Sequence, residues 1–214
     1  MSILFNVSGV DLECFYAAEA MKEVVKGLDG DTLKTIEILD FNTMINNHDD
    51  EEWLNIINDM DVIVPGNLKL LSASNVNDKK ILKEVAVSAF IKMFLKYICK
   101  HGQKVFIIAL SQDDLEKTIE SIKEKCEHIN LKGMSVSELT GRSEDEIINE
   151  INATDPDCII SVLPSPKQEK FIRDNRSYIN ARVWLGCGEV FKSMSGRHRK
   201  RNLLSFFKKD KNNM

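Results

Sequence analysis

Residues 158–172 read CIISVLPSPKQEKFI and pass from a strand pattern directly into a helix pattern. The first five residues form a short apolar run, which is typical of a strand buried on both faces. Pro164 and Pro166 end this run, and a helix is expected to begin directly after them. Because parallel α/β sheets bind ligands beyond the carboxyl ends of their strands, Gln168 and Glu169 stand where a ligand is expected.

Similar strand patterns occur along the rest of the chain, at residues 3–7, 35–39, 62–64, 105–109, 130–134 and 181–186. Apolar residues at helical spacing predict helices between them, at residues 17–28, 51–57, 88–100, 113–127 and 143–152. Ser143, with Glu146 three residues later, predicts a capping box. Strands that alternate with helices predict an α/β fold with a Rossmann-like, mostly parallel sheet and helices on both faces.

Length and charge predict one domain with a short appendage. The 214 residues suit a single α/β domain at residues 1–196, followed by a basic amphipathic C-terminal tail at residues 197–214. The tail begins with Arg197, Arg199 and Arg201, and it has apolar residues between basic clusters, so contact with an anionic membrane surface and a solvated tail are both open. The formal net charge of -4 gives no case for a nucleic-acid partner.

The five cysteines have no metal-ligand spacing, and their odd number argues against a disulfide framework. We therefore expect thiols in a reducing compartment. No apolar run approaches the roughly 20 residues of a membrane span. The sequence predicts a cytoplasmic protein, with peripheral contact at the inner face of the membrane if the tail binds lipid.

The signature region of the chain reads PKQEKFIRDN at residues 166–175, GCGE at 186–189 and FKSMSG at 191–196. In order and spacing these segments resemble the WecG/TagA/CpsF family of bacterial glycosyltransferases. The resemblance implies an inverting transferase that moves a sugar such as N-acetylmannosamine from a UDP-sugar to a polyprenyl-diphosphate-linked acceptor. The product would enter cell-wall or surface polysaccharide, for example teichoic acid. No metal and no cofactor beyond the donor are implied.

The resemblance also implies a set of substrate-binding residues at the strand ends. They are Asn42, Gly66, Asn67, Lys167, Gln168, Glu169, Gly186 and Gly188. The tail arginines, Arg197, Arg199 and Arg201, would contact the membrane or the acceptor diphosphate. A glutamine amide offers a donor and an acceptor to sugar hydroxyls or a uracil edge. Taken alone, Lys-Gln-Glu is more often an exposed first helical turn, and an asparagine after a strand more often a turn or a cap.

The chain departs from the family pattern where the catalytic groups are expected. The family's Pro-Asp-Gly turn, with its proposed general base, reads Pro65-Gly66-Asn67 here, so the catalytic residue is unknown. No arginine precedes Arg142, which removes the expected diphosphate clamp. Ala109-Leu110-Ser111 replaces a glycine pair, and Glu189 replaces a glycine.

Two further interpretations follow from these departures. One is a catalytically degenerate member that binds or scaffolds another glycosyltransferase, as a hetero- or homo-oligomer. The other is an unrelated nucleotide-binding module, which is disfavoured because no GxGxxG or Walker pattern is present. Cys187 as a nucleophile is also disfavoured, because no histidine lies nearby in the sequence and a small buried cysteine is the commoner role.

Overall fold

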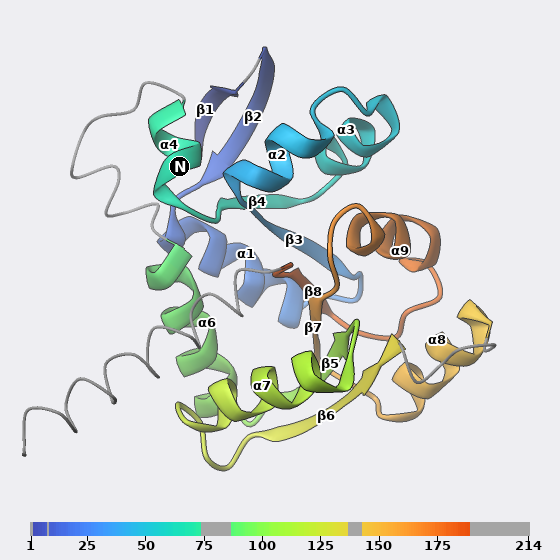
Figure 1. Ribbon diagram of the computed structural model, residues 1–214. Coiled ribbons are helices and arrows are strands. Elements are labelled where there is room, and N and C mark those ends of the chain that lie inside the picture. Colours follow the sequence, from blue (N-terminus) through green and yellow to red (C-terminus); the bar gives the residue numbers. More distant parts are fainter. Residues whose placement is uncertain (1, 8, 74–86, 137–142, 189–214) are drawn as a thin grey trace, which may run out of the picture.

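The computed structural model describes residues 2–7, 9–73, 87–136 and 143–188. Within these residues eight strands form one sheet, in the order β1-β2-β4-β3-β8-β7-β5-β6 (Figure 1). The strands are β1 (Ser2–Val7), β2 (Val10–Phe15), β3 (Lys34–Leu39), β4 (Val62–Pro65), β5 (Lys104–Ala109), β6 (Asn130–Ser135), β7 (Cys158–Val162) and β8 (Val183–Gly186).

All neighbouring strands are parallel except β1 and β2, which form an antiparallel hairpin at one edge. The predicted α/β, Rossmann-like fold is therefore confirmed. Strand β2 was not predicted, because its sequence VDLECF alternates apolar and acidic residues and forms no apolar run. Gly9 turns the chain between the two strands with φ +84°, a conformation that suits glycine.

The helices of the described residues are α1 (Ala17–Leu28), α2 (Phe41–Asn47), α3 (Glu51–Asn58), α4 (Leu68–Ala73), α6 (Val87–His101), α7 (Gln112–Lys123), α8 (Glu144–Ala153) and α9 (Lys167–Asn175). Polar side chains cap several of their first turns. Asp40, Asp50 and Ser111 each accept a backbone N–H at the start of α2, α3 and α7. The capping box predicted at Ser143 and Glu146 is present at the start of α8.

Helices cover both faces of the sheet (Figure 1). The buried side chains of the central strands divide between a cluster on each face. On one face, Ile36 and Ile38 of β3 belong to a buried cluster with α1, α6 and α7. On the other face, Trp184 of β8 packs with α8 and α9. The residue between Ile36 and Ile38 is Glu37, so its side chain points to the face that α9 covers.

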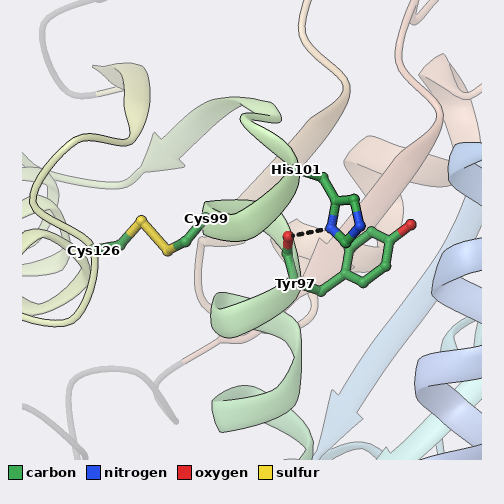
Figure 2. Close-up of a disulfide and its surroundings, with 4 residues drawn as sticks. All are labelled: Tyr97, Cys99, His101 and Cys126. Atoms are coloured by element: carbon green, nitrogen blue, oxygen red, sulfur yellow. Dashed lines mark hydrogen bonds between the residues drawn. A yellow bond between two sulfur atoms is a disulfide. The ribbon is translucent and has the colours of Figure 1, made fainter.

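The structure corrects the expectation that all five cysteines are thiols. Cys99, near the end of α6, forms a disulfide with Cys126 in the turn after α7 (Figure 2). Cys14, Cys158 and Cys187 are free and buried. The two paired cysteines are 27 residues apart in the sequence, and the fold places the end of α6 next to the turn after α7.

None of the helices in the described part of the chain is both long and apolar enough to cross a membrane. The predicted tail at residues 197–214, with Arg197, Arg199 and Arg201, lies outside the described residues.

Because Cys99 and Cys126 are paired, the denatured protein should have fewer free thiols than cysteines. Thiol titration of the purified chain, denatured without reductant, should find three thiols, matching the three free cysteines. A reductant should lower the midpoint of urea unfolding of the wild type, because a cross-link across this loop stabilises by about 3 kcal/mol. The same reductant should leave a Cys126→Ser variant unchanged. Five titratable thiols would contradict the pairing.

Candidate functional site at the ends of three parallel strands

The turn between β7 and α9 is fixed by side chains from two other helices. Ser165, in a Pro164-Ser165-Pro166 turn with a cis peptide bond before Pro166, accepts a hydrogen bond from the Trp53 indole at 3.1 Å. The Asn47 side chain lies 3.5 Å from the same hydroxyl. Because Trp53 belongs to α3 and Asn47 to α2, both helices help to hold the start of α9.

Gln168, in the first turn of α9, is buried and has a fixed orientation. Its Nε2 donates to Glu37 Oε1 of β3 at 2.6 Å, and its Oε1 accepts from the backbone N–H of Gly188 at 3.1 Å. A backbone N–H can only donate, so it requires the amide oxygen, and the amide nitrogen must then face Glu37. The side chain thus joins β3 to the segment that follows β8.

Two glycines make room for this contact. A Cβ atom on Gly186, the last residue of β8, would lie 2.0 Å from Glu37 Oε2 and 2.6 Å from Gln168 Nε2. Gly188 has φ +47°, in the left-handed region, and presents its N–H to Gln168. Gly186 and Gly188, which were predicted to bind substrate, lie against Glu37 and Gln168 in the structure.

Glu37 and Glu169 form a pair of buried carboxyl groups beside Gln168. Burial first, and then the nearby Glu169 carboxyl, raise the pKa of Glu37 well above its ordinary value, and the Gln168 hydrogen bond offsets only part of this. Burial also raises the pKa of Glu169. The neighbouring Ser165 hydroxyl and Trp53 indole lower this pKa by a smaller amount. Burial therefore favours a neutral Glu37.

Three of the four carboxyl oxygens make no hydrogen bond of ordinary geometry with the described residues, although Ser165 and the Trp53 indole lie close enough to Glu169 to lower its pKa. They are Glu37 Oε2 and both oxygens of Glu169. Buried polar atoms in folded proteins nearly always have a partner, so these oxygens mark a place where water or ligand hydroxyls would be accommodated. The arrangement places a fixed amide beside a neutral carboxyl that can donate a proton, and the three side chains involved are at most 2% exposed.

The predicted residues of the neighbouring strand ends have structural roles. Gly66 donates its N–H to Leu39 O at 2.7 Å, and a Cβ there would lie 3.1 Å from the Leu39 and Asp40 backbone. Asn67 accepts the N–H of Leu70 at 3.0 Å. Asn42 is exposed on α2, which Asp40 caps. These residues shape the ends of β3 and β4, and no hydrogen bond is observed from them to Gln168.

Lys167 and Cys187 lie in opposite environments, one exposed and the other buried. Lys167 is exposed beside the buried Gln168 and Glu169. Cys187 is fully buried, and burial followed by the nearby Glu37 raises its thiol pKa, which fits the interpretation of a packed cysteine and disfavours a nucleophile. Among the described residues, no group of three His, Cys, Asp or Glu side chains is placed to hold a metal ion.

Sequence reasoning missed Glu37, which contacts Gln168 directly. Its one signal is a glutamate within the otherwise apolar strand segment Ile36 to Leu39. An isolated charged residue in a strand usually indicates a solvated face, but here the side chain is only 2% exposed. Its importance depends on the contact with α9, more than 130 residues later in the chain.

A separate cavity of about 400 Å³ lies between α3 and α9. It is lined by Thr35 at the start of β3, by Ile172 and Arg173 in the second half of α9, and by Arg176 just after this helix. The cavity is therefore toward the amino end of β3, whereas Gln168 stands on the first turn of α9. Arg173 pairs with Glu52 at 2.6 Å and Arg176 with Asp59 at 3.3 Å, so the charges around the cavity are balanced.

Comparisons with known proteins agree with the resemblance seen in the sequence. The family model for the glycosyl transferase WecG/TagA/CpsF family matches residues 5–202. An N-acetylglucosaminyldiphosphoundecaprenol N-acetyl-beta-D-mannosaminyltransferase of Bacillus subtilis (strain 168) is 22% identical over 69% of this chain and 57% of its own length. A protein of the same name from Bacillus spizizenii is 24% identical over 66% of this chain and 54% of its own length. The matches thus span little more than half of these relatives.

The raised pKa of Glu37 predicts a specific pH dependence of stability. The folded state keeps the proton that the unfolded state releases near the ordinary glutamate pKa of 4.5, so the stability is present below this pH. As the pH rises above it, toward the folded pKa, the free energy of unfolding should fall by about 1.4 kcal/mol per pH unit.

A Glu37→Gln variant, which keeps the shape and an acceptor for Gln168, should lack this part of the loss. Urea unfolding of both proteins between acid and neutral pH measures the difference. The exposed Glu120 of α7 offers a matched control, since Glu120→Gln should keep the wild-type profile. Parallel profiles for the wild type and Glu37→Gln would contradict a buried neutral carboxyl.

Proposed function

Because the chain belongs to the WecG/TagA/CpsF family of glycosyl transferases, whose family model matches residues 5–202, we propose that it binds a nucleotide-sugar donor at the Gln168 site. It then transfers the sugar to a lipid-diphosphate-linked acceptor. In the proposed reaction an acceptor hydroxyl attacks the anomeric carbon, UDP leaves from the opposite side, and the hydroxyl proton passes to a base. No cofactor beyond the UDP-sugar takes part.

The observation that carries the proposal is the fixed amide of Gln168 at the carboxyl ends of β3, β7 and β8. Both of its contacts hold the side chain in one orientation, so little conformational freedom is lost when a ligand binds. An amide has two N–H donors, and only one is used by Glu37 among the described residues. The second donor and the unpartnered oxygens of Glu37 and Glu169 supply the polar groups that a sugar or a uracil edge needs.

The identity of the substrates is drawn from the relatives. Both are named for transfer of an N-acetyl-beta-D-mannosaminyl group to N-acetylglucosaminyldiphosphoundecaprenol. We therefore propose UDP-N-acetylmannosamine, or a close relative of it, as the donor and a polyprenyl-diphosphate-linked sugar as the acceptor. The proposed place of work is the cytoplasmic face of the membrane, in cell-wall or surface polysaccharide synthesis.

The positions of the carboxyl groups favour a second candidate function. The protein would then be a catalytically degenerate family member that binds the donor but does not transfer the sugar. The turn at Pro65-Gly66-Asn67 carries no carboxylate, and the Asn67 side chain caps α4. Asp40 caps α2 through the N–H of Thr43. Glu37 contacts Gln168 but is buried with a raised pKa, so it is placed to position the amide and poorly placed to accept a proton. Such a protein would serve as a partner of another glycosyltransferase.

Both candidate functions require binding of the nucleotide-sugar donor, so a binding measurement tests them together. Titration calorimetry with UDP and UDP-N-acetylmannosamine should detect binding to the wild type, and Gln168→Ala should weaken it by at least about tenfold, the loss expected for one or two buried hydrogen bonds. Gln112→Ala, which changes an exposed glutamine on α7, is the matched control and should bind as the wild type does. Circular dichroism should show that both variants are folded.

A transfer assay with a polyprenyl-diphosphate-linked acceptor distinguishes the two candidate functions. Release of UDP with formation of the glycosylated lipid would support the transferase. Donor binding without transfer would support the degenerate member. Absence of nucleotide binding to the folded wild type at millimolar concentration would contradict the proposed donor site.

A further inference from the structure

A lysine-lined groove runs along the exposed side of α6. It has a volume of about 760 Å³ and is walled by Lys92, Lys96 and Lys100 of the helix and by Lys125 of the turn after α7. The three helical lysines are four residues apart, so they lie in one row. Ile91 and Leu95, both buried, form part of the floor.

The disulfide described above fixes the opposite wall of this groove. Cys99 also lines the groove, and its bond to Cys126 joins the turn that carries Lys125 to α6 (Figure 2). The fourth lysine is therefore held beside the other three by a covalent link.

The charge of the groove is not balanced by the described part of the protein. All four lysines are exposed, none has an ion pair with a described residue, and no described acidic residue lines the groove. Glu124 and Glu127 lie in the same turn as Lys125 but not in the lining. The cavity between α3 and α9 differs, because its arginines are paired with Glu52 and Asp59. Four adjacent cations in a chain of formal net charge -4 repel one another and attract an anionic partner.

We propose that this groove docks the protein on an anionic membrane, with lipid phosphate groups lying between the lysines. The inference rests on the proposed function, because a lipid-linked acceptor lies in a membrane that the enzyme must reach. The basic segment at residues 197–211 has the same sign of charge as the groove, so it does not neutralise it. A membrane presents many phosphates in one plane, which suits a row of lysines more than a single soluble anion does.

Vesicle binding of the full chain tests this docking surface. The wild type should co-sediment with vesicles of phosphatidylcholine and phosphatidylglycerol in equal amounts, and not with phosphatidylcholine alone. Binding should weaken with added salt, which screens charges. The variant Lys92→Gln/Lys96→Gln/Lys100→Gln should bind acidic vesicles roughly tenfold to a hundredfold more weakly, since each lysine at an acidic surface strengthens binding several-fold.

A matched control removes the same number of charges elsewhere. Lys22, Lys117 and Lys132 are exposed on α1, α7 and β6, and their joint replacement by glutamine should leave vesicle binding within about twofold of the wild type. Equal binding by the groove variant and the wild type would overturn the proposal and assign any affinity to another part of the chain. Equal losses in both variants would also overturn it, because net charge alone would then explain them.

Binding of soluble ligands distinguishes the groove from the donor site. Binding of UDP-N-acetylmannosamine should be the same in the groove variant as in the wild type. Replacement of the three lysines should not change the binding of inorganic pyrophosphate. If pyrophosphate binding depended on these lysines while acidic vesicles did not bind, a membrane would be the wrong partner. Loss of vesicle binding in the groove variant, in a protein that binds no nucleotide, would support docking and contradict only the proposed function.

Discussion

The side-chain amide of Gln168 is the contact on which the arrangement of the candidate site depends. It joins Glu37 of β3 to the backbone of Gly188 after β8, and Gly186 leaves the space in which the two side chains meet. Because Glu37 is fully buried, loss of this partner would leave a polar group without compensation in an apolar sheet, which costs about 1 to 3 kcal/mol. The same contact that orients the amide therefore also stabilises the sheet.

Helices α2 and α3 support this contact from outside the sheet. Trp53 and Asn47 hold the Ser165 turn, and Glu52 pairs with Lys170 and Arg173 on the following turns of α9. Those ion pairs are exposed and contribute little singly, so the buried indole hydrogen bond is the more important support. Site geometry and fold stability are thus linked through the start of α9. The lysine groove on α6 is on the other face of the sheet, which lets donor binding and membrane contact be tested independently.

Much of the fold could be predicted from the sequence, because most strands are short apolar runs that end at turn residues, as residues 158–166 show. Gln168 was predicted from its place at a strand end, and Gly186 and Gly188 from the resemblance to the family; the structure brings all three together. Glu37 was not predicted, because its burial depends on α9. Asn67, which was predicted to bind substrate, caps a helix in the structure. The Cys99–Cys126 pair could not be predicted, since an odd number of scattered cysteines does not specify a pairing.

The most direct test of the central claim is nuclear magnetic resonance of the Gln168 side-chain amide, assigned by its absence from the spectrum of Gln168→Ala. With both of its contacts formed, the amide should show two distinct proton resonances protected from exchange, and titration with UDP-N-acetylmannosamine should shift them. Rapidly exchanging resonances that do not respond to any nucleotide-sugar, in the folded wild type, would contradict a fixed amide that binds the donor.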